Sequence, residues 1–272
     1  YERVAAGHRA AGREAPAQVP PPSLPHRVDD SIRSVAGADL DDPEYAIEVS
    51  YEGSYELDEA TLADGSTLIS SLRIPLLLCP SEKNDRPLID GSERHYPLTY
   101  AINMGTWFVF DPATRTGGDG AFQVNGKLKS AQFTDGLSKT LAFSEVKAYT
   151  SYRRNADLSF FQAPSSPTAI DAYGGEEKPD GAHTEWVDGK TNQTGFTTVF
   201  TPNTFVPITI SGKLVDGDWT NRREGTDVTK PTLAAVTSRS YHAGIVSSAF
   251  MDGSIRSISN GIDGVLWKAL ST

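Results

Sequence analysis

Apolar and β-branched residues occur along this chain in short runs, which glycine and proline separate at close intervals. Residues 46–51, Ala-Ile-Glu-Val-Ser-Tyr, alternate between apolar and polar side chains, which is the period of a half-buried strand. The 24 glycines and 17 prolines disfavour long helices and are compatible with frequent turns. The pattern therefore predicts an α+β protein that is predominantly antiparallel β, with several β-hairpins and a few short helices.

The middle of the chain contains further strand and turn signals. The apolar run at residues 74–80 is short and contains two prolines, so we expect a buried strand or an extended segment there. One or two helical turns are expected between Leu57 and Leu72, and residues 151–195 are polar and expected to be rich in loops. Asn-Gly and Asp-Gly steps favour tight turns, and the expected hairpin units and turns are residues 100–110, 117–120, 122–124, 125–126 and 140–146.

The end of the chain has the strongest hairpin signal. Residues 241–251 and 254–258 are strand-like runs on either side of Asp252-Gly253. Aspartate tolerates the left-handed backbone region and glycine adopts it without steric cost, so this step predicts a tight turn between two strands. A short helix is expected at residues 264–270, with Trp267 turned inward.

The first 45 residues differ in composition from the rest. They begin rich in alanine, arginine and glycine, with a short helix expected at residues 4–14, and continue through a proline-rich spacer at residues 20–25. We therefore expect an N-terminal segment with a proline-rich linker, residues 1–45, followed by a β-rich head domain, residues 46–272. The chain starts at Tyr1 and not at methionine, which suggests that an upstream part was removed, was processed or is not included in this sequence.

Charge and cysteine content narrow the classes of partner and site. The formal net charge of −10 argues against binding to nucleic acid or to an anionic membrane, and favours calcium or a basic partner. The single cysteine, Cys79, excludes an internal disulfide framework and a zinc site with several thiolates. No stretch has the roughly 18 apolar residues that a membrane-spanning helix needs. These features are typical of a well-solvated exported protein.

Several sequence blocks, taken in order, resemble one bacterial family. His242 is followed after nine residues by Asp252-Gly253, which forms an H-x9-DG pattern. The further blocks are Leu78-Cys79-Pro80-Ser81-Glu82, Tyr100-Ala101-Ile102-Asn103-Met104-Gly105, Thr134-Asp135-Gly136-Leu137-Ser138-Lys139-Thr140 with Ser144-Glu145, and Ser238-Arg239-Ser240-Tyr241-His242. Together they resemble the prepilin-type processing-associated H-x9-DG proteins, or domain of unknown function 1559, over roughly residues 70–272.

That resemblance implies a fold and a role. Members of the family are similar to type IV pilins and pseudopilins, which implies a pilin-like head, an exported location at the cell surface or in the periplasm, and assembly with other copies or related subunits. The motif residues that it marks are His242, Asp252, Gly253, Asp135, Gly136, Cys79, Pro80 and Glu145. Family members open with a basic leader, a cleavage site and a long apolar helix. None of these is recognisable here, so this helix has been either removed from the chain or lost, and membrane contact is expected only through such an upstream helix.

Most of the motif residues are expected to have structural roles. We expect His242 to bond a backbone carbonyl or the surroundings of Arg239, because the spacing supplies no third partner for catalysis. Asp252-Gly253 and Asp135-Gly136 are interpreted as turns. Glu145 is expected to hold the loop beside Asp135 through a buried hydrogen bond, and Cys79 to be an inert apolar residue.

The densest group of oxygen ligands lies near residues 216–227. Asp216, Asp218, Glu224 and Asp227 loosely resemble a calcium-binding loop, although Arg222 and Arg223 intrude and favour a hydrogen-bonded Arg/Asp loop instead. The pair His183 and Glu185 is a weaker transition-metal candidate. Aromatic residues that suit core packing better than sugar stacking are Trp107, Phe108, Phe110, Trp186, Phe196, Phe200 and Trp219.

Three functional hypotheses follow from the sequence. The first is a non-enzymatic structural subunit of a pilus-like, pseudopilus-like or other cell-surface assembly, and it is favoured because no set of titratable residues converges in the sequence pattern. The alternative is a secreted calcium- or carbohydrate-binding module that has no filament helix. The third, least favoured, is a hydrolase that works through His242 or His183.

Overall fold

The computed structural model describes residues 46–48, 60–62, 64–156, 158, 162–222, 224, 227 and 229–272. The predicted helix at residues 4–14 and the proline-rich spacer lie outside the described residues. Of the strand predicted at residues 46–51, the structure describes β1 (Ala46–Glu48), which pairs antiparallel with β7 (Lys127–Lys129).

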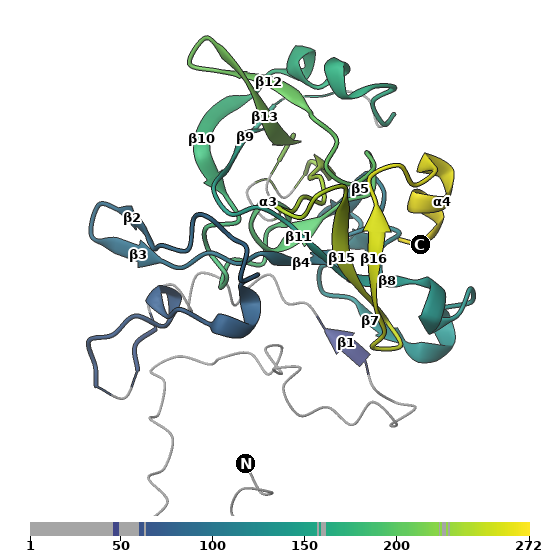
Figure 1. Cartoon of the computed structure of the whole chain (residues 1–272), viewed down its shortest axis with the longest axis horizontal. Coiled ribbons are helices and arrows are strands. Elements are labelled where there is room, and N and C mark those ends of the chain that lie inside the picture. Colours follow the sequence, from purple (N-terminus) through teal and green to yellow (C-terminus); the bar gives the residue numbers. More distant parts are fainter. Residues whose placement is uncertain are drawn as a thin grey trace, which may run out of the picture.

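Two sheets form the main part of the described fold (Figure 1). The strands of the five-stranded sheet are, in spatial order, β11 (Gly195–Phe196), β4 (Tyr100–Asn103), β8 (Leu141–Glu145), β15 (Ile245–Phe250) and β16 (Ile255–Ser259). Those of the seven-stranded sheet are β10 (Glu176–Ala182), β9 (Thr150–Arg154), β13 (Lys213–Thr220), β14 (Thr232–Ala235), β5 (Phe108–Asp111) and β6 (Thr116–Gly117), with β12 (Pro207–Ile210) paired to β13. Apart from the parallel pairs β11–β4 and β13–β9, the pairs in these sheets are antiparallel, which confirms the predicted fold class.

Short elements connect these sheets. A small hairpin is formed by β2 (Leu88–Asp90) and β3 (Glu93–His95). Among the described residues, the helical segments have at most six residues each. They are η1 (Ile69–Ser71), η2 (Pro75–Leu77), η3 (Ser130–Gln132), η4 (Leu137–Lys139), η5 (Pro167–Ala169), η6 (Asp171–Tyr173), α3 (Thr191–Thr194) and α4 (Gly264–Ala269). The predicted helical turn between Leu57 and Leu72 is confirmed by η1.

The C-terminal hairpin agrees with its prediction. β15 and β16 pair from Ile245 opposite Ser259 to Ala249 opposite Ile255, and Gly253 has φ 81° in the turn. Along β15, the side chains of alternate residues Val246, Ser248 and Phe250 are buried, as the strand period requires. The buried Ser248 hydroxyl is bonded to Ser144 of β8, so the polar group on this face is satisfied.

Helix α4 closes the chain against the first sheet. Asp263 caps the helix by accepting hydrogen bonds from the backbone N–H groups of Val265 and Leu266. Trp267 is fully buried and donates its indole N–H to the carbonyl of Phe200. The inward tryptophan is therefore confirmed, and truncating it to alanine would remove a core side chain worth about 3–5 kcal/mol.

Two hydrophobic clusters stabilise the sheets. One includes Phe196 and Trp267, and the other contains Trp107 and Trp219, whose stacked rings lie 5.6 Å apart. Trp107, Phe110, Phe196, Phe200 and Trp219 are buried, while Phe108 and Trp186 are partly buried and pack against these clusters. The aromatic residues thus pack in the core, as predicted, and do not form a sugar-stacking surface.

Two predictions for the first half of the chain need correction. Residues 74–80 were expected to be a buried strand or an extended segment, and this holds for Ile74 and Leu78, which are extended. Between them Pro75 begins the 3₁₀ helix η2, and Leu76 is 85% exposed. The segment 100–110 is not a hairpin, because β4 and β5 belong to different sheets. Instead β5 pairs with β6 through residues 112–115, and the glycine-rich segment 117–120 begins at the last residue of β6.

The interpretation of residues 151–195 as loops is incomplete. The segment contains most of β9 and all of β10, which pair antiparallel. Glu176 lies opposite Arg154, and Glu177 opposite Arg153, so opposite charges face one another across the pair. Cross-strand ion pairs stabilise this edge without the apolar alternation that marks a strand in a sequence.

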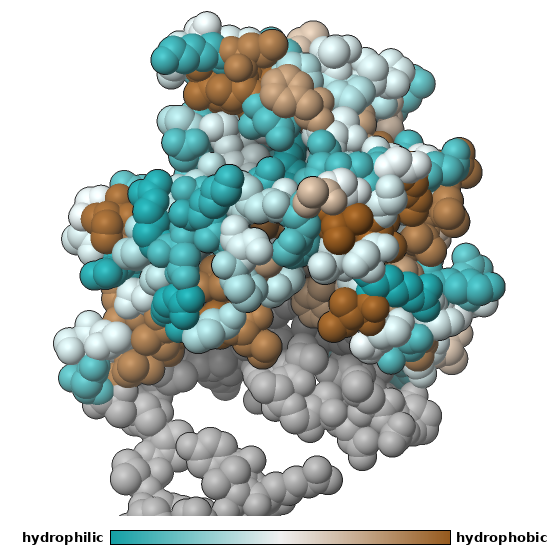
Figure 2. All heavy atoms as spheres, in the orientation of Figure 1, coloured by the Kyte–Doolittle hydropathy of each residue, from teal (hydrophilic) through white to brown (hydrophobic). Residues whose placement is uncertain are grey.

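On the face of the molecule shown in Figure 2, hydrophobic residues lie in separate patches among hydrophilic ones. Among the described residues, no helix is both long and apolar enough to cross a bilayer.

Candidate functional site

Three motif residues that are distant in the sequence meet beside the five-stranded sheet. Cys79 follows η2, Glu145 ends β8, and His242 lies three residues before β15. The His242 Nε2 atom is 3.1 Å from Glu145 Oε1 and 3.5 Å from Cys79 Sγ. These residues are far apart in the sequence, and their only common signal there is that each belongs to a block resembling the same family.

Local turns fix the position of Cys79. Its backbone N–H donates to Thr99 Oγ1 at 2.6 Å, and the N–H of Glu82 donates to the Cys79 carbonyl at 2.9 Å, which closes a turn through Pro80. The side chain is partly buried and has the His242 imidazole as a polar neighbour, whereas the sequence predicted an inert apolar residue. Burial raises the pKa of the Cys79 thiol, Glu145 raises it further, and a hydrogen bond from the Ser81 backbone opposes this shift.

Glu145 anchors the loop that carries His242. Its Oε2 atom accepts a 2.6 Å hydrogen bond from the backbone N–H of Ser247, and its backbone carbonyl accepts from Arg239 N–H at 2.8 Å. Only 2% of the residue is exposed. Glu145 therefore holds the loop before β15 through buried hydrogen bonds, whereas the sequence predicted that it would hold the loop beside Asp135.

The position of His242 differs from its prediction in two respects. It lies outside β15, and its side-chain partner is the Glu145 carboxylate instead of a backbone carbonyl or the region of Arg239. A catalytic relay needs the nucleophile and the orienting acid on opposite ring nitrogens of the histidine. Here the thiol and the carboxylate both approach Nε2, so the proton on this nitrogen can serve only one of them.

Tyr100 borders the same cluster. It lies opposite Glu145 in the pairing of β4 with β8. Burial raises the pKa of its phenol to about 12, with additional contributions from Cys79 and Glu145. The phenol is therefore protonated at neutral pH and can donate a hydrogen bond.

The two Asp-Gly steps lie in turns and not in the cluster. Asp252 Oδ1 accepts hydrogen bonds from the backbone N–H and the hydroxyl of Ser254, which confirms its turn role. Asp135-Gly136 precedes η4, and Gly136 has φ 94°, a conformation that disfavours residues with a Cβ atom.

The candidate calcium site, which the sequence favoured less than a hydrogen-bonded Arg/Asp loop, is not assembled. Asp216 and Asp218 are both ion-paired with Arg239, which is fully buried. The remaining two carboxylates have other partners: Glu224 accepts from Thr191, and Asp227 accepts from Thr229 and lies 3.8 Å from Arg222. The arginine that neutralises the first two carboxylates comes from residue 239, so the local sequence could not reveal it.

His183 belongs to this buried network and not to a metal site with Glu185. Its Nδ1 atom lies 2.8 Å from the carbonyl of Gln193, and its Nε2 atom lies 3.7 Å from Asp218 Oδ2. Burial opposes ionisation of Asp218, but the charge of Arg239 and the contact with His183 hold the pKa of this carboxyl below its ordinary value. The geometry is that of a structural charge network.

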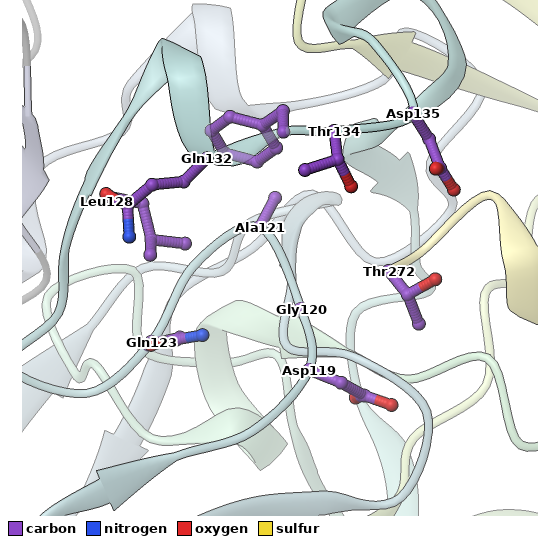
Figure 3. A pocket seen from close by; sticks show the side chains of 10 residues that line it. Asp119, Gly120, Ala121, Gln123, Leu128, Gln132, Thr134, Asp135 and Thr272 are labelled. Carbon is purple, nitrogen blue, oxygen red and sulfur yellow. The ribbon is translucent and has the colours of Figure 1, made fainter.

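A pocket of about 350 Å³ lies away from the cluster. In Figure 3, Thr134 and Asp135 lie on one wall, and Asp119 and Gly120 lie opposite them. The Asp119 carboxylate already accepts hydrogen bonds from the backbone N–H and hydroxyl of Thr106. The pocket lining contains neither a cysteine nor a histidine, and thus lacks the groups of a nucleophile–base pair.

Comparison with known proteins gives one match. The family model described as a protein of unknown function (DUF1559) matches residues 40–264, which is most of the chain. No curated protein and no solved structure matches.

Proposed function

The chain belongs to the DUF1559 family, and from this premise we propose that it is a non-enzymatic structural subunit of a pilus-like or other cell-surface assembly. Its partners in this role are other copies of itself or related pilin-like subunits, and its location is outside the inner membrane. The pilin-like relationship rests on the resemblance of the motif blocks. The sheet edge described below supplies a physical means of assembly.

The observation that carries this proposal is the exposed edge strand β16. It is the last strand in the order of the five-stranded sheet, and four of its five residues are exposed, including Ile255 at 76%. An edge strand presents backbone N–H and C=O groups that can pair with a strand of another chain. Assembly by strand addition at this edge requires no change in the fold.

The hydrogen-bond register shows which groups face outward. Phe250 N–H donates to Ser254, and Asn260 N–H donates to Gly244. Along two antiparallel strands, hydrogen-bonded residue pairs alternate with pairs that are not hydrogen-bonded. The N–H groups of residues 256 and 258 therefore point toward β15, and those of Ile255, Ser257 and Ser259 point away from it. These three outward N–H groups are the donors that a partner strand would use.

The geometry around His242 supports a non-catalytic role. The thiol of Cys79 and the carboxylate of Glu145 share one ring nitrogen, and no relay from acid to base to nucleophile passes through the imidazole. Burial also keeps the thiol pKa high, whereas a cysteine nucleophile requires a lowered one.

Ser257→Pro tests this assembly. Proline removes the outward N–H without removing a bond to β15, so the head should keep its fold and lose the ability to extend the sheet. We expect the complete native protein to form oligomers or filaments by light scattering and electron microscopy, and the variant to form far fewer. Ser257→Thr keeps the N–H and is the matched control. A native protein that is strictly monomeric, or a proline variant that assembles as the control does, would refute the proposal.

A further inference from the structure

We propose that Cys79, Glu145 and His242 form a binding site for Zn²⁺. Their three potential ligand atoms, a thiol sulfur, a carboxylate oxygen and an imidazole nitrogen, all lie within 4.8 Å of one another. Among the described residues, this is the one group of three or more His, Cys, Asp or Glu side chains whose ligand atoms lie close enough together to hold an ion. The inference is independent of the proposed assembly role.

The distances match a tetrahedral zinc centre. Zinc–sulfur bonds of about 2.3 Å and zinc–nitrogen or zinc–oxygen bonds of about 2.0–2.1 Å place sulfur about 3.5 Å from nitrogen, and nitrogen about 3.3 Å from oxygen, at tetrahedral angles. The corresponding separations here are 3.5 Å from Cys79 Sγ to His242 Nε2, and 3.1 Å from that nitrogen to Glu145 Oε1. Two of the three separations therefore already fit an ion, and the third, between the sulfur and the carboxylate oxygen, is at most 4.8 Å.

The charge of the cluster also suits a divalent cation. A thiolate at Cys79 and a carboxylate at Glu145 carry two negative charges, which Zn²⁺ neutralises. In the described structure, the one ion-pair partner of Glu145 is His242, so neither lysine nor arginine occupies the position of the ion. Thiolate and imidazole ligands favour zinc over calcium, which prefers oxygen ligands alone.

Surrounding backbone groups orient the ligands. The Ser81 backbone bonds the sulfur of Cys79, and the Ser247 N–H holds Glu145 Oε2 and leaves Oε1 directed at His242. Such outer contacts position metal ligands in proteins. The His242 side chain is 35% exposed, which gives the ion a route from solvent, and the fourth tetrahedral position is left for water.

Binding exchanges one proton for the metal. The thiol of Cys79 loses its proton to solvent as the sulfur–zinc bond forms. The His242 proton that bonded Glu145 moves through solvent from Nε2 to Nδ1, so the imidazole stays neutral and the hydrogen bond is replaced by bonds from each residue to zinc. No oxidation or reduction takes place. Because a proton is released, affinity should fall as the pH is lowered.

The test is titration of the chelator-treated protein with ZnCl₂ by calorimetry and with CoCl₂ by absorption spectroscopy. We expect one Zn²⁺ per chain, and a thiolate-to-cobalt charge-transfer band that reports the sulfur ligand. Cys79→Ser should abolish this band, and both Cys79→Ser and His242→Ala should weaken zinc binding by at least about tenfold. Ser247→Ala, which keeps the backbone N–H that holds Glu145, is the matched control and should bind as the wild type does.

Each other result counts against the site. A wild-type protein that binds neither metal, or binds Zn²⁺ with unchanged affinity in both ligand variants, would overturn the proposal. Binding of Ca²⁺ in place of Zn²⁺ would overturn it too. Circular dichroism and the melting temperature establish that the variants are folded, and His242→Ala, at a partly exposed position, provides a readout if Cys79→Ser does not fold.

Discussion

The Arg239 network and the His242 cluster both contain carboxylate and histidine side chains from distant parts of the chain, but only the first contains an arginine that neutralises the carboxylates. In the first, Arg239 bonds Asp216 through two nitrogens at 3.0 Å and Asp218 through a third at 2.5 Å. In the second, Glu145 has a histidine and a backbone N–H as partners. The difference teaches that acidic residues alone do not indicate a metal site, because an arginine can already occupy the position of the ion.

The comparison also separates stability from ligand binding. Both partners in the Arg239–Asp218 pair are shielded from water, and a buried charge that loses its partner is strongly destabilising. Around His242, the imidazole is 35% exposed and is solvated, while the buried Glu145 carboxylate keeps a backbone N–H as a second partner. We therefore expect substitutions in the first region to affect folding, and those in the second to affect ligand binding more than folding.

Arg239→Met should have the largest effect. It leaves the Asp218 carboxylate buried without its cation, which should lower the free energy of unfolding by about 3–5 kcal/mol. Urea denaturation at neutral pH measures the change. Arg73→Met, which breaks the solvent-exposed pair with Asp85, is the control and should cost little. Equal losses of unfolding free energy in the two variants would show that burial does not increase the contribution of the Arg239 network to stability.

Asp218→Asn should change the acid dependence of stability. The folded-state pKa of Asp218 is held below 3.8, its ordinary value, so its charge contributes stability at pH values above 3.8 that is lost as the pH falls through the folded pKa. We expect the wild type to lose stability more steeply below about pH 4 than the asparagine variant does. Urea denaturation at a series of pH values checks this, and parallel curves would exclude a contribution from Asp218.

The structural elements that could be predicted from the sequence are those set by neighbouring residues. Asp252-Gly253 fixes a turn through its own backbone preferences, and Trp267 follows a capped start of the short helix α4. Strand β10 escaped prediction because its stabilising partners, Arg153 and Arg154, lie on another strand. Local patterns thus predict turns and amphipathic strands, but not strands that cross-strand charges stabilise.

The candidate site could not be assembled from the sequence. Cys79 precedes Glu145 by 66 positions, and Glu145 precedes His242 by 97, so only the pairing of β8 with β15 and the position of η2 bring them together. The acidic residues 216–227 are close in the sequence and suggested a site for that reason. Asp216 and Asp218 pair with Arg239 and not with a metal ion, and no pattern within that segment indicates this arginine.

Glu145→Gln should have a smaller effect than Arg239→Met. Glutamine keeps the size of the side chain and an acceptor for the Ser247 N–H, but loses the charge that strengthens both hydrogen bonds. We expect a loss of about 1–2 kcal/mol in the free energy of unfolding. Urea denaturation of this variant beside Ser247→Ala, which leaves those bonds in place, measures it. A loss as large as that of Arg239→Met would mean that the His242 cluster is as dependent on charge as the buried network.

The smallest effect concerns the reactivity of Cys79, which labelling can follow without ambiguity because the chain has a single cysteine. Burial raises the pKa of this thiol above 9.0, so little of the reactive thiolate is present at neutral pH. We expect iodoacetamide to modify the metal-free folded protein more slowly than the urea-unfolded chain at neutral pH, and the folded rate to keep rising at pH values where the unfolded rate levels off. His242→Ala should change the neutral rate little, since Nε2 is also bonded to Glu145. If labelling is instead fast at neutral pH and His242→Ala abolishes it, the imidazole activates the thiol. That result would support a catalytic role for the cluster.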